Sequence, residues 1–382
     1  MKNSRESKNN NNKPRKEIIM NIPNTNKPHR NHAAALLGAA FLCILLLALS
    51  IGTASAVPKS PPAPTATLLV SGLEGTQGST VGPDGALYVT ENLEGRIWCV
   101  DPETGQVTTF ASGLPPSLSG IGNGGVVDVA FIGKTAYALV TGVASDSGGT
   151  SVVGIYRVDG PASFTVVADI GEFNLLNPPT IPFDLPTGFQ YAIQTFRGGF
   201  LVTDANLNRV LRVTLDGEIS VFIDFDNIVP TGLAVFGDTV LMAEGGPDPH
   251  TPQTGKVVSF GPKSSTATEV ASGVPWVLDV QFGLGRTLYA LSFGTFDPNT
   301  ESLNLAVPNT GALVKVNGDG TFTVVVHGLN QPTSLQFIGN KAYVVTLTGE
   351  IWRIDGLSGP PFGPAPVTET AADTQNSRSG AQ

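Results

Sequence analysis

Apolar and polar residues alternate in short runs over residues 65–356, and Gly, Asp, Asn and Pro separate the runs. Runs rich in Val, Ile, Leu, Phe, Thr and Tyr are typical of β-strands. No window keeps apolar residues at the three-to-four spacing of an amphipathic helix, so the pattern predicts an all-β protein. One strand pattern recurs six times, at residues 96–101, 154–159, 209–214, 256–260, 312–317 and 350–355. Each copy follows a second apolar strand, at residues 86–90, 136–141, 200–203, 240–243, 288–292 and 342–346.

The repeat has a period of about 51 residues, because five steps separate Trp98 from Trp352, which lies 254 positions later. A unit of this length cannot bury its own apolar face, so neighbouring units must pack against each other. We therefore predict a six-bladed β-propeller with four-stranded antiparallel blades over residues 66–356. Only three strands fit into the last repeat, and residues 67–71 resemble the fourth strand of the first. The N-terminal strand is expected to join the last blade and to close the ring.

Loop lengths distinguish the two faces of the predicted propeller. The turns after the first and third strands of each repeat are short, whereas every long insertion follows a second or a fourth strand. These insertions span residues 142–152, 171–189, 245–254 and 293–310. Long loops on one side of a rigid scaffold commonly carry binding sites, so this face is the expected functional one. The alternative is that insertions accumulate there because they do no harm.

The flanking segments differ in composition from the repeats. Residues 33–51 form an apolar run after a basic leader, and Ala54-Ser55-Ala56 is typical of a cleavage site. We interpret residues 1–56 as a leader and signal peptide, which predicts a secreted protein with no membrane contact after cleavage. Met20 is a second candidate start, and a retained membrane anchor is the alternative. Residues 57–65 are expected to be a Pro-rich linker, and residues 357–382 a disordered tail.

Removing the leader changes the charge of the chain. Residues 1–56 hold eight of the 22 Lys and Arg but two of the 31 Asp and Glu, which leaves the rest with a net charge of −15. Such a surface repels phosphate backbones, so nucleic acid is not an expected partner. Cys43 lies in the leader, so Cys99 has no partner for an internal disulfide and is expected to pack as a small apolar residue.

Acidic and amide residues follow several predicted strands near the expected axis. Carboxylates that converge there would repel each other unless a cation or protons intervened, and oxygen ligands suit Ca²⁺ or Mg²⁺. The alternative is that each acid accepts hydrogen bonds from nearby backbone N–H groups in a water-filled channel. The predicted metal ligands are Glu91, Asp204 and Glu244, and the predicted ligand-binding residues are Asn92, Asp128 and Asn206.

Catalytic candidates are few in this chain. His250 lies in the long loop 245–254 beside Asp248, where it is placed to act as a general base. Asp279 is the second candidate for moving protons, and no Gly-x-Ser-x-Gly segment or Ser-His-Asp set stands out. A loop histidine beside Pro and Asp is more often simply solvated. Phe173, Phe293 and Phe296 form a candidate apolar lip for an organic ligand, or else anchor the loops.

The repeats resemble those of known propellers. The segment Val81–Glu91, followed by Gly95-Arg96-Ile97, is similar to a blade of NHL-like and gluconolactonase-like six-bladed propellers. Residues 202–211 look like an NHL repeat, and the string from Gly78 to Leu114 most resembles the ScyD/ScyE family. That resemblance implies a secreted bacterial propeller from a family associated with the making of scytonemin, an extracellular pigment.

The gluconolactonase-like propellers hold a divalent cation in the channel with one Glu, Asn residues and an Asp. Glu91 and Asp204 match the acidic members of that set. The Asn positions do not match, because the second repeat offers Val140 or Thr141 and the fifth offers Ser292. This departure counts against a lactonase.

Three functional hypotheses follow from the sequence. The first is a secreted propeller that binds a small organic or glycan ligand on its long-loop face. The second is a metal-assisted hydrolase or lyase that uses the acids named above. The third is a scaffold in the cell envelope that binds a protein partner.

Overall fold

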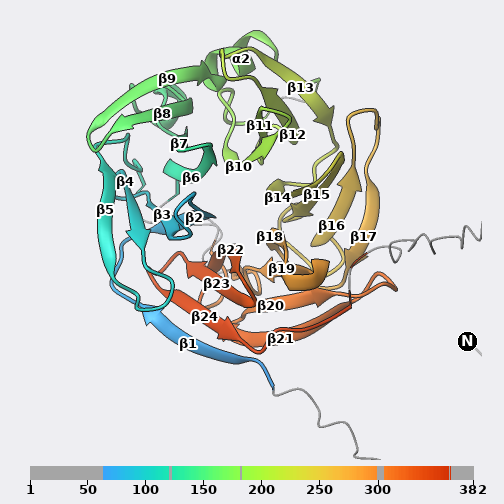
Figure 1. Ribbon diagram of the computed structural model, residues 1–382. Coiled ribbons are helices and arrows are strands. Elements are labelled where there is room, and N and C mark those ends of the chain that lie inside the picture. Colours follow the sequence, from blue (N-terminus) through green and yellow to red (C-terminus); the bar gives the residue numbers. More distant parts are fainter. Residues whose placement is uncertain (1–62, 120–122, 181–182, 299–304, 361, 363–382) are drawn as a thin grey trace, which may run out of the picture. The chain divides into compact units, whose positions relative to one another are not determined.

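Six four-stranded antiparallel sheets surround a central axis in the computed structural model, which describes residues 63–119, 123–180, 183–298, 305–360 and 362 (Figure 1). The first strand of each sheet lies nearest the axis and the fourth lies at the rim, as in the blades of a propeller. The predicted all-β six-bladed propeller is therefore confirmed. All the described residues belong to one compact unit.

Five blades take their four strands in chain order. Blade 1 contains β2 (Thr76–Val81), β3 (Leu87–Glu91), β4 (Arg96–Val100) and β5 (Val107–Ser112); blade 2 contains β6 (Gly125–Ile132), β7 (Thr135–Thr141), β8 (Gly154–Gly160) and β9 (Ser163–Asp169). Blade 3 contains β10 (Gln190–Phe196), β11 (Gly199–Asp204), β12 (Arg209–Val213) and β13 (Ile219–Asp224); blade 4 contains β14 (Pro230–Phe236), β15 (Thr239–Glu244), β16 (Lys256–Phe260) and β17 (Thr268–Ser272). Blade 5 contains β18 (Val277–Phe282), β19 (Leu288–Ser292), β20 (Gly311–Val316) and β21 (Phe322–Leu329).

Blade 6 combines strands from both ends of the described chain. Its strands are β22 (Pro332–Ile338), β23 (Lys341–Thr346), β24 (Ile351–Asp355) and β1 (Thr65–Val70), and β1 pairs antiparallel with β24. β1 begins at Thr65, the last residue of the predicted linker. Leu73 donates to the Gly349 carbonyl at 3.2 Å, just as Leu114 donates to the Gly95 carbonyl at 3.1 Å in blade 1. Residues 65–73 therefore occupy the position of a fourth strand.

The hydrophobic core lies between adjacent blades. Tyr88 of blade 1, for example, packs edge-on against Phe131 of blade 2, with ring centroids 4.7 Å apart. The same cluster contains the fully buried Ile97 from blade 1 and Val126 from blade 2. Burying a side chain of this size contributes about 1.5–3 kcal/mol. The strand pattern recurs because every blade must present an apolar face to each neighbour.

The long loops connect second to third strands or fourth to first strands, as predicted. Within the loop before β10, one helix was missed: α2 (Ile170–Leu176). Asp169 caps this helix by accepting a hydrogen bond from the Glu172 backbone N–H at 2.8 Å. Seven residues are too few to show a helical period in the sequence. The described residues also form two short 3₁₀ helices, η1 (Ser145–Ser147) and η2 (Leu284–Arg286).

The residues directly after the propeller are ordered against blade 5. Thr287 donates its hydroxyl to the carbonyl oxygens of Gly359 and Pro360 at 2.8 and 2.9 Å. Phe362 donates its N–H to the Arg286 carbonyl at 2.8 Å. The predicted disordered tail thus does not begin at residue 357, because these backbone groups pair with the edge of a hairpin.

The predicted signal peptide and most of the tail lie outside the described residues. No helix within the described ranges has the length and hydropathy that crossing a membrane requires.

Candidate functional site

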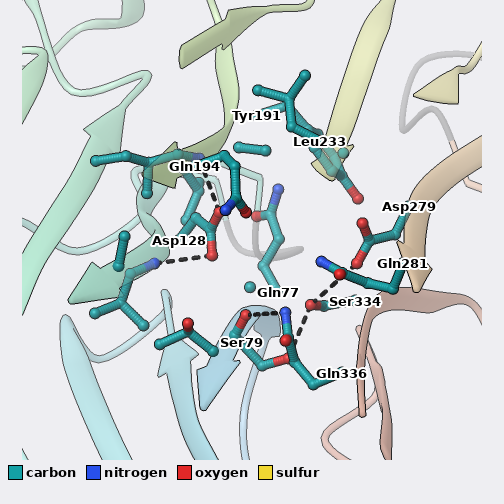
Figure 2. Close-up of a pocket in the computed structure, with 18 of the residues that line it drawn as sticks. Gln77, Ser79, Asp128, Tyr191, Gln194, Leu233, Asp279, Gln281, Ser334 and Gln336 are labelled. Atoms are coloured by element: carbon teal, nitrogen blue, oxygen red, sulfur yellow. Dashed lines mark hydrogen bonds between the residues drawn. The ribbon is translucent and has the colours of Figure 1, made fainter. Parts of the chain in front are cut away.

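A polar cavity of about 180 Å³ lies on the axis between the inner strands (Figure 2). Inner strands carry its polar lining because their inward-facing side chains are the ones that reach the axis. No Lys, Arg or His of the described chain lines this cavity. Its polar side chains include Gln77, Ser79, Asp128, Gln194, Asp279, Gln281, Ser334 and Gln336.

Two carboxylates in this axial cavity occupy equivalent positions. Asp128 of β6 and Asp279 of β18 each belong to a Val-x-Asp-Val-x-Phe segment, in blades three steps apart in the ring. Asp128 accepts hydrogen bonds from the Val129 N–H at 2.8 Å and the Ile193 N–H at 2.9 Å. Asp279 accepts corresponding bonds from Val280 at 2.8 Å and Leu335 at 2.7 Å.

Each of these carboxylates therefore ties the inner strand of its own blade to that of the next. A Cβ atom at Gly78 would overlap the Asp128 carboxylate, and one at Gly232 would overlap that of Asp279. Glycine in the preceding blade thus makes the room that each acid needs. The sequence predicted Asp128 as a ligand-binding residue and Asp279 as a catalytic one; the structure places both in the axial cavity, where each also joins two blades.

Burial changes the titration of both acids. Desolvation raises the pKa of Asp128 well above its ordinary value, and Asp279 adds to this by charge repulsion. Desolvation also raises the pKa of Asp279, to about 7, against the opposing effect of its hydrogen bonds. Between about pH 4 and pH 7 the native protein therefore holds protons that the unfolded chain has released. Stability from this source is greatest below about pH 4 and falls as the pH rises toward 7.

We expect Asp279→Asn to flatten the decline in the free energy of unfolding between pH 4.5 and pH 7.5. The upper limit of the effect is roughly 4 kcal/mol, since each pKa unit corresponds to about 1.4 kcal/mol. Chemical denaturation at several pH values measures it. Asp226→Asn changes an exposed carboxyl and is the matched control. Parallel stability curves for the wild type and Asp279→Asn would contradict this prediction.

Tyr191 separates the axial cavity from a second, larger pocket. Its hydroxyl donates to the Thr333 carbonyl at 3.0 Å, so the side chain of blade 3 reaches the inner strand of blade 6. Tyr191, Gln77 and Thr333 line both the axial cavity and the larger pocket. Burial raises the pKa of the Tyr191 phenol well above its usual value, which keeps it a neutral donor. We call the larger pocket, beyond Tyr191, the mouth pocket.

The mouth pocket has a volume of about 410 Å³ and is lined mainly by aromatic and aliphatic side chains. Trp276 stacks on His250, with ring centroids 3.9 Å apart and planes 7° from parallel. Phe293 contacts Trp276 edge-on at 4.7 Å. The lining residues are Gln77, Asn123, Leu185, Phe189, Tyr191, Ala205, Asn206, Val229, Thr231, Asp248, His250, Trp276, Leu278, Phe293, Thr333 and Leu347. Apolar walls with a few polar groups are the usual character of an organic-ligand site.

Two polar residues of the mouth lining, Asn206 and Asp248, are candidates to bind a ligand. The side-chain oxygen of Asn206 is buried and has no hydrogen-bond partner among the described residues. Leaving such an acceptor unpaired costs about 1–3 kcal/mol, so a donor supplied by a ligand would be favoured there. Asp248 lies exposed in the same lining. Asn206 was a predicted ligand-binding residue, and this geometry is consistent with that role.

The two predicted catalytic residues lie in different cavities. His250 is 4% exposed in the mouth pocket, and its Nδ1 lies 3.2 Å from the Gly245 carbonyl oxygen. Asp279 lies in the axial cavity, on the other side of Tyr191. The structure therefore does not bring them together around one substrate position.

The three predicted metal ligands lie in three different blades. Each ends the second strand of its blade, opposite a basic residue that begins the third strand. The register pairs are Glu91 with Arg96, Asp204 with Arg209, and Glu244 with Lys256. None of the three acids lines the axial cavity or the mouth pocket. The expectation that they converge on the axis is corrected by this placement, because each acid lies opposite a basic residue of its own blade and outside both cavity linings.

The carboxylates of Glu91 and Glu244 differ in the partners that balance their charge. Glu91 lies 3.2 Å from Arg96 Nη1 and accepts the Glu74 N–H at 2.9 Å. Burial raises the pKa of Glu244 to about 7, opposed by the positive charge of Lys256. The predicted ligand-binding residue Asn92 is fully buried and donates to Gln77 Oε1 at 2.9 Å, so it supports the wall of the pocket rather than lining it.

Asp204 is fully buried and is held by four donors. It accepts hydrogen bonds from the backbone N–H groups of Phe189 and Leu207 at 3.1 and 2.9 Å. It also accepts from the side-chain amides of Asn174 and Gln190, both at 2.8 Å. These bonds link β11 to the loop before β10. Desolvation nevertheless raises the pKa of this carboxyl.

In the described part of the chain, no three His, Cys, Asp or Glu side chains lie close enough together to hold a metal ion. The role of Glu91, Asp204 and Glu244 as metal ligands therefore stays a prediction.

Three aromatic residues that build the mouth pocket, Phe189, Tyr191 and Trp276, were not predicted from the sequence. Trp276 directly precedes an inner strand, and Phe189 and Tyr191 flank the start of another. An aromatic residue at the entry of an inner strand is a signal that the sequence contained. Phe293 was predicted to form an apolar lip, and it does line the pocket, whereas Phe173 lies under the Arg209 guanidinium at 5.7 Å.

Comparisons with known proteins support the fold. No family model matches the chain, and no curated protein matches it. A gluconolactonase from Xanthomonas campestris aligns with a TM-score of 0.54 and 11% identity, over 76% of this chain and 89% of that one. The PQQ-bound form of an aldose sugar dehydrogenase from Streptomyces coelicolor aligns with a TM-score of 0.52 and 16% identity, over 78% and 99%. A virginiamycin B lyase from Staphylococcus aureus aligns with a TM-score of 0.45 and 14% identity, over 77% of this chain and 99% of that one.

The likeness to the gluconolactonase and to the sugar dehydrogenase, both with TM-scores above 0.5, supports the six-bladed fold and shows no activity. PQQ, a tricarboxylate, would need cationic partners. No Lys or Arg among the described residues lines the axial cavity or the mouth pocket, so the residues present do not fit that cofactor.

Proposed function

We propose that this protein is a secreted ligand-binding propeller that holds a small organic molecule in its mouth pocket. The observation that carries the proposal is the aromatic lining of this pocket, at the loop-bearing end of the axis and beside the unpaired oxygen of Asn206. A ligand with an apolar face and at least one hydrogen-bond donor suits this combination.

The resemblance of the repeats to the ScyD/ScyE family supports a secreted role, linked to secondary metabolism of the scytonemin type. A planar organic ligand and a glycan both present an apolar face and hydroxyl or N–H donors. The chemistry of the pocket therefore accommodates either class, and direct binding measurements distinguish them.

Saturation-transfer NMR with indole and methyl glucoside as probes tests the proposal. We expect at least one probe to receive saturation from the wild-type protein. Trp276→Phe and Asn206→Ala should each weaken binding about three- to tenfold, through lost aromatic area and a lost acceptor. Trp98→Phe is the control, because Trp98 lies in β4, away from the pocket. No transfer from the wild type to either probe would overturn the proposal. Transfer from Asn206→Ala and Trp276→Phe that equals transfer from the wild type would overturn it as well.

A further inference from the structure

Apart from His250, the ionisable side chains of Asp, Glu, Lys and Arg type that line the two cavities are all acidic. Asp128 and Asp279 line the axial cavity, Asp248 lines the mouth pocket, and neither lining contains a Lys or Arg among the described residues. His250 lies in the mouth lining, but it is buried against Trp276. Clefts lined by acidic groups within low-dielectric walls concentrate cations and repel anions.

Asp248 is the member of this set that a ligand meets first. It is exposed in the loop between β15 and β16, and no described basic residue forms an ion pair with it. Its carboxylate is therefore available to a ligand.

Aromatic side chains complete the recognition chemistry. Phe189, Tyr191, Trp276 and Phe293 all line the mouth pocket. Aromatic rings attract organic cations through their quadrupoles, and this attraction grows when water is displaced from the site. Two of the four rings, Trp276 and Phe293, are each 4% exposed, so they lie in an environment that is already largely dry.

We infer that the mouth pocket selects a small organic cation, an amine or quaternary ammonium compound, over neutral or anionic molecules of the same shape. The inference rests on the proposed ligand-binding function and narrows its ligand class. In this pocket, the carboxylate of Asp248 would attract the positive charge of the ligand and the four aromatic side chains would contact its apolar groups.

Three probes of nearly the same shape test the inference. Choline is the cation, dimethylbutanol is its neutral carbon isostere, and dimethylbutanoate is the anion. We expect the wild-type protein to bind choline about tenfold more tightly than the alcohol, by titration calorimetry or NMR. The anion should bind more weakly than the alcohol, and the preference for choline should shrink at high salt because free charges are screened.

Asp248→Asn should reduce the preference for choline over the alcohol to about threefold. Asp216→Asn is the matched control, because Asp216 lies in the β12–β13 turn on the opposite face and should leave the preference unchanged. Equal affinity for choline and the alcohol would overturn the inference. In that case the proposed ligand-binding function would still hold if indole or methyl glucoside bound. Failure of every probe would overturn the proposed function as well.

Discussion

Gly349→Ala is expected to destabilise the propeller strongly. Gly349 has a φ of +84°, and a Cβ atom there would overlap the carbonyl oxygen of Leu73, which lies just after β1. The left-handed backbone costs an alanine about 1–2 kcal/mol, and moving the Leu73 carbonyl adds to this. We expect a total loss on the order of 3–5 kcal/mol, which lowers the melting temperature by about 10 °C. Thermal unfolding followed by circular dichroism measures the change.

The chain offers a matched control for this substitution. Gly339 also has a positive φ, of +62°, but a Cβ atom there would meet nothing within 4 Å. Gly339→Ala therefore carries the backbone strain without the collision, and should cost about 1 kcal/mol. If the two variants melted at the same temperature, residues 65–73 would not occupy the fourth-strand position of blade 6.

Asp204→Ala is expected to be the most damaging substitution at a predicted site residue. It leaves two backbone N–H groups and two side-chain amides without their acceptor in a fully buried position. Unsatisfied buried donors cost about 1–3 kcal/mol each, so we expect a loss of at least 3–5 kcal/mol. Proteolysis in the loop before β10 should also become faster, because Asp204 anchors that loop.

Asp226→Ala, in the exposed loop after β13, is the control and should change stability by less than about 0.5 kcal/mol. The metal hypothesis makes a different prediction for Asp204. A bound Ca²⁺ or Mg²⁺ would raise the melting temperature of the wild type by mass action. From the geometry we expect no such rise, and a rise that disappears in Asp204→Ala would favour the metal-dependent hydrolase.

The fold was predictable from the sequence because its signal repeats. Third strands such as Arg96–Val100 and Lys256–Phe260 recur at a regular interval, and errors in one copy are corrected by the others. The α2 helix was missed because it occurs once and spans under two turns. The packing of Phe362 was missed because nothing in a Pro- and Gly-rich segment marks which backbone group will find a partner.

The site was predicted less well because the direction of a side chain depends on register. A shift of one residue moves a strand residue from one face of a sheet to the other. Asp128 and Asp279 were correctly placed near the axis because they interrupt inner strands. Glu91 and Glu244 were wrongly expected to converge on the axis. The sequence already contained the basic residues that lie opposite them, Arg96 and Lys256. The orientation of Trp276 depends on loops whose contacts no local pattern encodes.

The mixed composition of blade 6 has a consequence for how the molecule forms. β1, the first strand of the described residues, has its hydrogen-bonding partner in β24, the last. Native assembly must therefore wait until nearly the whole described chain has been translated, and pairing across so many residues is slow. Until β24 is made, the backbone edge of β1 stays unpaired. An unpaired strand edge can pair with another chain, so partially synthesised chains are expected to be prone to aggregation.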